Sequence, residues 1–184
     1  MSTTNRSRGH SEKQFASVCG VFCPACTLYI ASTEEPERLT KMARMLGLPE
    51  EEARCLGCSS DVQGPTCRNC KLVACAVERG VEFCAHCTDY PCEELKEFQA
   101  AMPHRADLFE DGQRIRETGF EKWFRETFDK YTCRQCQTIN SAYDLVCRKC
   151  GNDPGSSFAD RHRQVVEKHH LAAILERESD AGDE

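Results

Sequence analysis

The sequence has little that would suit a membrane protein, a secreted protein or a familiar enzyme. It contains no run of about 18 apolar residues, the length that a membrane-spanning helix requires. Residues Met1 to Gln14 are polar and lack the apolar segment of a signal peptide, so we expect a cytoplasmic protein without a membrane anchor. No nucleophile–base pair, phosphate-binding loop or GxGxxG motif is present, and the chain is therefore not expected to be an enzyme.

Apolar residues other than cysteine are also modest in number for a chain of 184 residues, so we expect a thin core. Cysteine, with 15 copies, is the abundant residue. An odd number fits a disulfide framework badly, and a reducing compartment favours metal binding or redox chemistry. The formal net charge of −6 counts cysteines as neutral, and thiolates would make it more negative. Nucleic acid is therefore not an expected partner.

Six pairs of cysteines have the spacing C-x-x-C, which is half of a tetrahedral metal site. One backbone turn can direct both thiolates of such a pair at one ion. We expect three to four zinc ions, with a [4Fe–4S] cluster in the N-terminal domain as the alternative cofactor. The candidate metal ligands are Cys19, Cys23, Cys26, Cys55, Cys58, Cys67, Cys70, Cys75, Cys84, Cys87, Cys92, Cys133, Cys136, Cys147 and Cys150.

The pairs Cys133/Cys136 and Cys147/Cys150 are separated by ten residues, a spacing typical of a four-cysteine zinc ribbon. The intervening residues alternate as a strand should, at Ile139, Ser141, Tyr143 and Leu145. Glycine at position 151 suits the positive φ that ends a metal-binding knuckle. Gln137 occupies the matching place in the first knuckle and is a poorer choice.

The block from Cys19 to Cys92 is harder to divide into sites. The spacing C-x2-C-x4-C over residues 67–75 recurs over residues 84–92, which suggests two half-units that clasp metal between them. Eleven cysteines and His86 would fill three tetrahedral sites, but two all-cysteine sites with three spare cysteines fit as well. The ligands that we regard as safest are Cys67, Cys70, Cys84 and Cys87.

Cys19, Cys23 and Cys26 have the C-x3-C-x2-C spacing by which radical SAM enzymes hold a [4Fe–4S] cluster. Those enzymes use a βα barrel of about 200 residues, whereas only 158 residues follow Cys26 and they show no βα alternation. We interpret the match as coincidental.

Outside the cysteine pairs the pattern predicts helices. Leu39, Met42, Ala43 and Leu46 fall at i, i+3, i+4 and i+7, which indicates an amphipathic helix that ends at Gly47. Residues 93–131 are expected to be helical, with breaks at Gly112 and Gly119. A last helix is expected within residues 160–176. The histidines expected at the surface are His10, His104, His162, His169 and His170.

Aromatic residues line one face of the segment that precedes the ribbon: Phe120, Trp123, Phe124, Phe128 and Tyr131. This face lacks a basic surround, so it does not suit nucleic acid. It offers more aromatic surface than a small core needs, and we therefore expect a protein partner to bind around the helices between Glu93 and Tyr131.

These patterns predict a small metal-stabilised α+β protein with an irregular, partly helical, cysteine-rich N-terminal domain, a helical middle segment and a C-terminal zinc ribbon. The expected segments are a disordered leader (1–14), a cysteine-rich metal-binding domain (15–100), a helical segment (101–131), the zinc ribbon (132–155), a helix (156–176) and an acidic tail (177–184).

Several sequence blocks resemble a prokaryotic family known as domain of unknown function 3795. They are CGVFCPACTLYIA (19–31), CLGC (55–58), CAVERGVEFCAHCTDYPCEEL (75–95), IRETGFEKW (115–123) and the cysteine pairs of the ribbon with the Ser157–Phe158 that follows. The resemblance implies a cytoplasmic protein of a bacterium or archaeon that binds a metal presumed to be zinc, and it implies no activity.

The leading hypothesis is a zinc-binding, non-catalytic interaction module that binds another protein. The alternative is an iron–sulfur protein, either an electron carrier or a component of a redox enzyme, that uses the 19–92 block. A nucleic-acid-binding ribbon ranks last, because the basic residues around it are offset by acidic ones and by the thiolates.

Overall fold

The computed structural model describes residues 12–100 and 102–180. Most of the expected leader and the last four residues of the expected acidic tail therefore lie outside the described residues. The helices in chain order are η1 (Glu12–Phe15), η2 (Cys23–Ala25), α1 (Thr27–Thr33), α2 (Pro36–Leu46), α3 (Glu50–Ala53), α4 (Lys71–Glu78), η3 (Cys84–His86), α5 (Glu93–Ala100), η4 (Pro103–Arg105), α6 (Leu108–Thr118), α7 (Phe120–Tyr131) and α8 (Ser157–Asp180), where η denotes a 3₁₀ helix.

The fold is mostly helical. Across the described ranges, extended pairing is limited to two isolated bridges, Ala16 with Phe22 and Thr132 with Ile139. The expected β component of an α+β fold is thus not formed. In its place, the cysteine-rich regions are built from short turns whose amide groups bond to nearby carbonyls and side chains.

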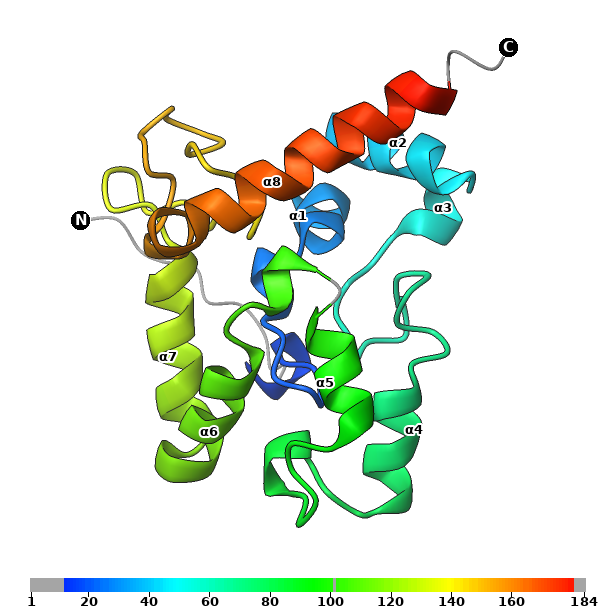
Figure 1. The fold of residues 1–184 in the computed structure, drawn as a ribbon, viewed down its shortest axis with the longest axis vertical. Coiled ribbons are helices and arrows are strands. Elements are labelled where there is room, and N and C mark those ends of the chain that lie inside the picture. Colours follow the sequence, from blue (N-terminus) through cyan, green and yellow to red (C-terminus); the bar gives the residue numbers. More distant parts are fainter. Residues whose placement is uncertain (1–11, 101, 181–184) are drawn as a thin grey trace, which may run out of the picture.

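Figure 1 shows how the helices are arranged. α6 and α7 form a helical hairpin along one side, and α8 crosses the end of α7. α1 and α2 pack against each other, and α4 and α5 occupy the lower part of this view beside the loop that contains η3. The metal-binding candidates lie in the loops and helix starts between these elements.

Phe22 occupies the centre of the largest apolar cluster. Its ring stacks on Tyr131 with centroids 5.8 Å apart and meets Trp123 and Phe124 edge-on at 6.3 and 5.4 Å. Trp123 is 0 % exposed. The aromatic row of α7 is therefore core, apart from the partly exposed Phe128, and the argument for a partner site on this row was wrong. The rings of this row cover the Phe22 side chain, which is almost completely buried.

The amphipathic helix was predicted correctly. α2 runs from Pro36 to Leu46, buries Leu39 and Ala43, and ends at Gly47 with φ of 65°. The Gly47 and Leu48 amides bond back to the last turn of the helix, which is the usual way a left-handed glycine closes a helix. α1 and α4 also form in the cysteine-rich block, where the sequence indicated only one regular apolar helix.

The expected break at Gly112 is wrong, whereas the break at Gly119 is confirmed. Gly119 has φ of 81° and separates α6 from α7. Gly112 lies inside α6, where a Cβ atom would stand only 2.1 Å from the Tyr90 hydroxyl oxygen. Glycine is therefore required at position 112 by close packing and does not interrupt the helix.

α8 extends beyond both ends of the 160–176 range, although its start lies within the expected segment 156–176. It begins at Ser157 because the buried Ser156 hydroxyl accepts a hydrogen bond from the Ala159 amide at 3.1 Å, and it continues to Asp180. His162 has a non-helical backbone conformation within it.

Three histidines that were expected at the surface, His104, His162 and His169, are partly buried, and His10 lies outside the described residues; polar contacts hold His162 and His104. The Nε2 atom of His162 is 2.7 Å from Oδ1 of the buried Asp107, which also binds Lys130 of α7 at 3.1 Å. The Nδ1 atom of His104 is 2.7 Å from the Tyr143 hydroxyl. Burial, with smaller effects from Arg105 and His169, lowers the pKa of His104 to about 4. Both side chains therefore belong to contacts between segments that are distant in the sequence.

Candidate metal centre

Four cysteine sulfurs converge near the C-terminal end of α7. The Sγ atoms of Cys133, Cys136, Cys147 and Cys150 all lie within 4.8 Å of one another. Cys133 and Cys150 are 3.7 Å apart, and Cys136 and Cys147 are 3.5 Å apart. Sulfurs bound to one tetrahedral zinc at about 2.3 Å stand about 3.8 Å apart, so these four cysteines could hold a metal ion of that size.

Each cysteine pair is formed by the same backbone turn. The Gln137 amide donates to the Cys133 carbonyl at 2.9 Å, and the Gly151 amide donates to the Cys147 carbonyl at 3.0 Å. Both closing residues have positive φ, 62° at Gln137 and 74° at Gly151. Glutamine thus adopts the conformation for which glycine is better suited, and the first turn keeps the geometry of the second.

The segment between the pairs does not form the strands of a ribbon. The Asn140 side chain donates to the Gly155 carbonyl at 2.8 Å and accepts from the Arg148 amide at 3.0 Å. The Asp144 carboxylate accepts from the Ser141 amide at 2.8 Å. These side chains take the backbone partners that a strand ladder would otherwise use, so only the bridge from Thr132 to Ile139 remains.

The electrostatics of the four thiols favour a bound cation. The Thr138 hydroxyl and amide lower the pKa of Cys136 to about 6 by hydrogen bonding. At Cys150, a hydrogen bond from the Asn152 amide lowers the pKa. Burial and the three neighbouring thiols raise it, and the resulting pKa is about 12. The thiols of one cluster cannot all ionise without a positive charge between them, and a divalent metal would supply it.

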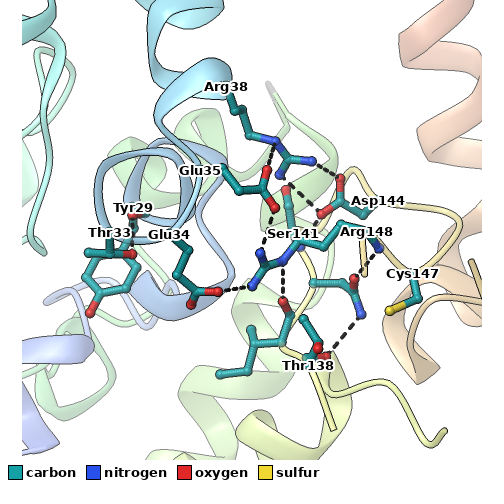
Figure 2. Close-up of polar contacts among 12 residues, drawn as sticks. Tyr29, Thr33, Glu34, Glu35, Arg38, Thr138, Ser141, Asp144, Cys147 and Arg148 are labelled. Atoms are coloured by element: carbon teal, nitrogen blue, oxygen red, sulfur yellow. Dashed lines mark hydrogen bonds and ion pairs between the residues drawn. The ribbon is translucent and has the colours of Figure 1, made fainter. Parts of the chain in front are cut away.

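Ion pairs attach this site to the N-terminal half of the chain, as Figure 2 shows. Arg148 lies between two of the cysteines, and its guanidinium contacts Glu34 and Glu35, the latter at 2.6 Å. Arg38 binds Glu35 at 2.8 Å and Asp144 at 2.9 Å. The Arg148 side chain is only 9 % exposed, so its ion pair with the partly buried Glu35 is better protected from water than an ordinary surface pair.

Two further hydrogen bonds join the same regions. The Thr27 and Ser141 hydroxyls are 2.5 Å apart, and the Ala142 amide donates to the Ala25 carbonyl at 3.3 Å. Ala25 lies between Cys23 and Cys26, so the loop of the four-cysteine site rests directly on another C-x-x-C turn.

Five cysteines form a second gathering: Cys23, Cys26, Cys55, Cys58 and Cys67. The Cys58 amide donates to the Cys23 sulfur at 3.5 Å. A hydrogen bond from the Cys58 thiol lowers the pKa of Cys67 to about 6, and burial, together with the charges of Cys55 and Cys67, raises the pKa of Cys26 to about 11. Cys67 therefore contacts Cys58, a cysteine outside its own C-x2-C-x4-C unit.

A third gathering surrounds a small cavity of about 50 Å³, whose lining includes Cys75, Cys84, Cys87 and Cys92. Burial and the charges of Cys19 and these neighbours raise the pKa of Cys84 to about 12. Cys19 packs with Cys70, Cys84 and Cys92 in an apolar cluster.

His86 is exposed, and its ring packs edge-on against Phe83 at 5.7 Å. Within the described parts of the chain, the C-terminal four are the one set of three or more potential ligands whose atoms all lie within 4.8 Å. The upstream ligand assignments, including His86, stay predictions. Sequence analysis did not identify the ion pairs of Arg38 and Arg148. The arginine inside a C-x-x-C pair and the adjacent Glu34 and Glu35 were signals that could have indicated them.

Comparison with protein families gives a match over part of the chain. Residues 15–97 match the family DUF3795. The family is described as a protein of unknown function, and the match supports the resemblance inferred from the sequence blocks over those residues. No curated protein and no solved structure matches the chain.

The DUF3795 segment, residues 15–97, contains the second and third cysteine gatherings and ends before the four-cysteine site. Among the described helices, none is long and apolar enough to cross a membrane.

Proposed function

We propose that this chain is a zinc-stabilised, non-catalytic module that acts by binding another protein. The observation that carries the proposal is the closed set of four sulfurs from Cys133, Cys136, Cys147 and Cys150. Zinc bound by four thiolates has no position left for water or substrate, so such a site contributes folding energy instead of catalysis.

The surroundings of the site support a structural role. Arg148 extends from the second cysteine pair to Glu34 and Glu35, and the loop between the pairs contacts Ala25 and Thr27. A metal that fixes this loop would also fix how it rests on the DUF3795 segment. The bound ion would therefore order a contact between two regions that are far apart in the sequence.

A candidate surface for the protein partner is the second half of α8. Leu171, Ile174 and Leu175 occupy one helix face at i, i+3 and i+4, and each is more than half exposed. Grouped exposed aliphatic side chains of this kind mark protein-binding surfaces more often than scattered ones do. This surface replaces the buried aromatic row of α7 as the place where we expect binding.

Elemental analysis of the purified chain tests the first part of the proposal. We expect Cys147→Ser to lose one zinc per chain relative to the wild type, while the adjacent Val146→Ser retains it. An ion held by three protein ligands, with an open position facing solvent, would overturn the non-catalytic interpretation.

Affinity capture from the native cells tests the second part. Leu171→Glu with Leu175→Glu should lose the proteins captured by the wild type, while circular dichroism and zinc content stay unchanged. Glu167→Lys with Lys168→Glu, on the preceding turn of α8, is the matched charge control. An identical set of captured proteins for the wild type and the leucine variant would exclude this surface.

A further inference from the structure

The cavity beside α4 and η3 is lined by cysteines that the four-cysteine site does not use. Cys75 comes from α4, Cys84 and Cys87 come from the η3 turn, and Cys92 directly precedes α5. Three separate backbone elements therefore present thiols to one small space of about 50 Å³.

The rest of the lining is suited to a metal–sulfur group. Leu72, Ala76, Val81 and Leu95 form much of the wall, and Leu72 and Leu95 are almost completely buried. One cationic group reaches the sulfurs, because Nη1 of Arg79 donates to the Cys87 Sγ at 3.7 Å while also binding Asp89 at 2.5 Å. An N–H donor on a ligating thiolate within an apolar shell is a common way in which proteins tune metal–sulfur centres.

The sulfurs around this cavity are farther apart than those at the C-terminal site. Among the described side chains, no three ligand atoms here lie within 4.8 Å of one another, in contrast to Cys133, Cys136, Cys147 and Cys150. A single zinc ion requires sulfurs about 3.8 Å apart. In a four-iron cluster each cysteine binds a different iron, so the four sulfurs surround a larger group and stand farther apart.

We propose that this cavity binds a four-iron, four-sulfide cluster through Cys75, Cys84, Cys87 and Cys92. The proposal goes beyond the zinc-stabilised module, because it concerns other cysteines and another metal. Cys75 is exposed, so one ligand would lie at the protein surface and the cluster would be open to attack by oxygen. The chain would then contain one site for a single zinc ion and a separate site for iron and sulfide.

The test uses the full chain, purified without oxygen and reconstituted with sulfide and equal amounts of ferrous and ferric iron in the presence of zinc. We expect about four irons and four sulfides per chain, with the broad absorbance of a four-iron cluster near 400 nm. Cys84→Ser and Cys92→Ser should lose most of the iron and retain zinc. Cys136→Ser should lose zinc and retain iron, which separates a failure of this proposal from a failure of the proposed function.

Cys58→Ser is the matched control within the DUF3795 segment, since Cys58 contacts Cys23 and Cys67 instead of lining the cavity. It should retain the iron. Equal loss of iron in Cys58→Ser and Cys84→Ser, or zinc in place of iron at the cavity, would overturn the assignment.

Alkylation of the wild-type chain covers the case in which the serine variants fail to fold. Trypsin would release residues 80–96, which carry Cys84, Cys87 and Cys92, and residues 55–68, which carry Cys55, Cys58 and Cys67. Iron and sulfide should protect the first peptide from iodoacetamide several-fold more than the second. Equal labelling of residues 80–96 with and without iron would contradict the proposal.

Discussion

The Arg148 guanidinium donates a hydrogen bond to the Glu35 carboxylate at 2.6 Å across 113 positions of sequence. Arg148 lies between Cys147 and Cys150, and Glu35 directly precedes α2. The same guanidinium donates to the Ile139 carbonyl at 2.8 Å. One side chain thus connects the four-cysteine site, the loop between its cysteine pairs and the DUF3795 segment.

Arg148→Ala should destabilise the chain by about 2–3 kcal/mol, because it leaves the Ile139 carbonyl without this donor and leaves Glu35 with Arg38 as its remaining cation in a poorly hydrated place. Chemical denaturation of the zinc-loaded protein measures this difference. Lys149→Ala is the control, since Lys149 is the neighbouring exposed cation. Equal midpoints for the two variants would show that the contacts of Arg148 contribute no more than a surface charge.

Removal of the proposed zinc ion should unfold the region around residues 130–155, because structural zinc sites contribute on the order of 10 kcal/mol of binding free energy. A chelator, or Cys147→Ser, should make this region sensitive to protease while the α6–α7 hairpin resists longer. Limited proteolysis with mass spectrometry reports the cleavage sites. Unchanged cleavage after complete zinc loss would contradict a structural role for the ion.

Gln137→Gly should stabilise the folded chain by about 0.5–1 kcal/mol, because Gln137 has φ of 62° and glycine adopts this conformation without steric cost. Gly151→Ala makes the opposite change in the second turn, where φ is 74°, and should destabilise by about 1 kcal/mol. Thermal unfolding of both zinc-loaded variants tests the pair. A lower midpoint for Gln137→Gly would indicate that the hydrogen bond from Gln137 to the Arg134 carbonyl outweighs the backbone strain.

Gly112→Ala should destabilise the chain by about 2–3 kcal/mol, since the added methyl group would overlap the Tyr90 ring and hydroxyl. Combining it with Tyr90→Ala should make the two effects less than additive, because the overlap is then removed. Gln113→Ala on the same helix is the neutral control. Strict additivity in the double variant would exclude the proposed clash.

Protonation of His104 should make the folded chain less stable in mild acid. An unfolded histidine has a pKa near 6.5, while burial lowers the folded value to about 4, so the folded state binds fewer protons between these values. The contribution of the neutral His104 to the free energy of unfolding is fully present above about pH 6.5. It decreases as the pH falls toward 4, by up to about 3 kcal/mol. Unfolding measured from pH 7 to 5 should show a smaller decrease for His104→Gln than for the wild type. Parallel curves would show that His104 does not contribute.

The sequence predicted local features well and long-range contacts poorly. The C-terminal cysteine pairs, α2 and the break at Gly119 follow from spacing or from backbone preferences within a few residues. Gly112 was misinterpreted because its role depends on Tyr90, which is distant in the sequence. The strands of the ribbon were predicted from alternation, but Asn140 and Asp144 supply hydrogen bonds that alternation does not reveal. The burial of Trp123 could not be predicted from the sequence, because it depends on contact with the ring of the distant Phe22.

The position of Phe22 has a consequence for how the chain can be divided. Phe22 belongs to the DUF3795 segment, yet the rings that enclose it, those of Trp123, Phe124 and Tyr131, all lie beyond residue 97. A fragment that stops at the family boundary would expose this ring to water and give up its aromatic contacts. In this chain the segment that matches the family is therefore smaller than the unit that packs together, and fragments meant for expression should extend through α8.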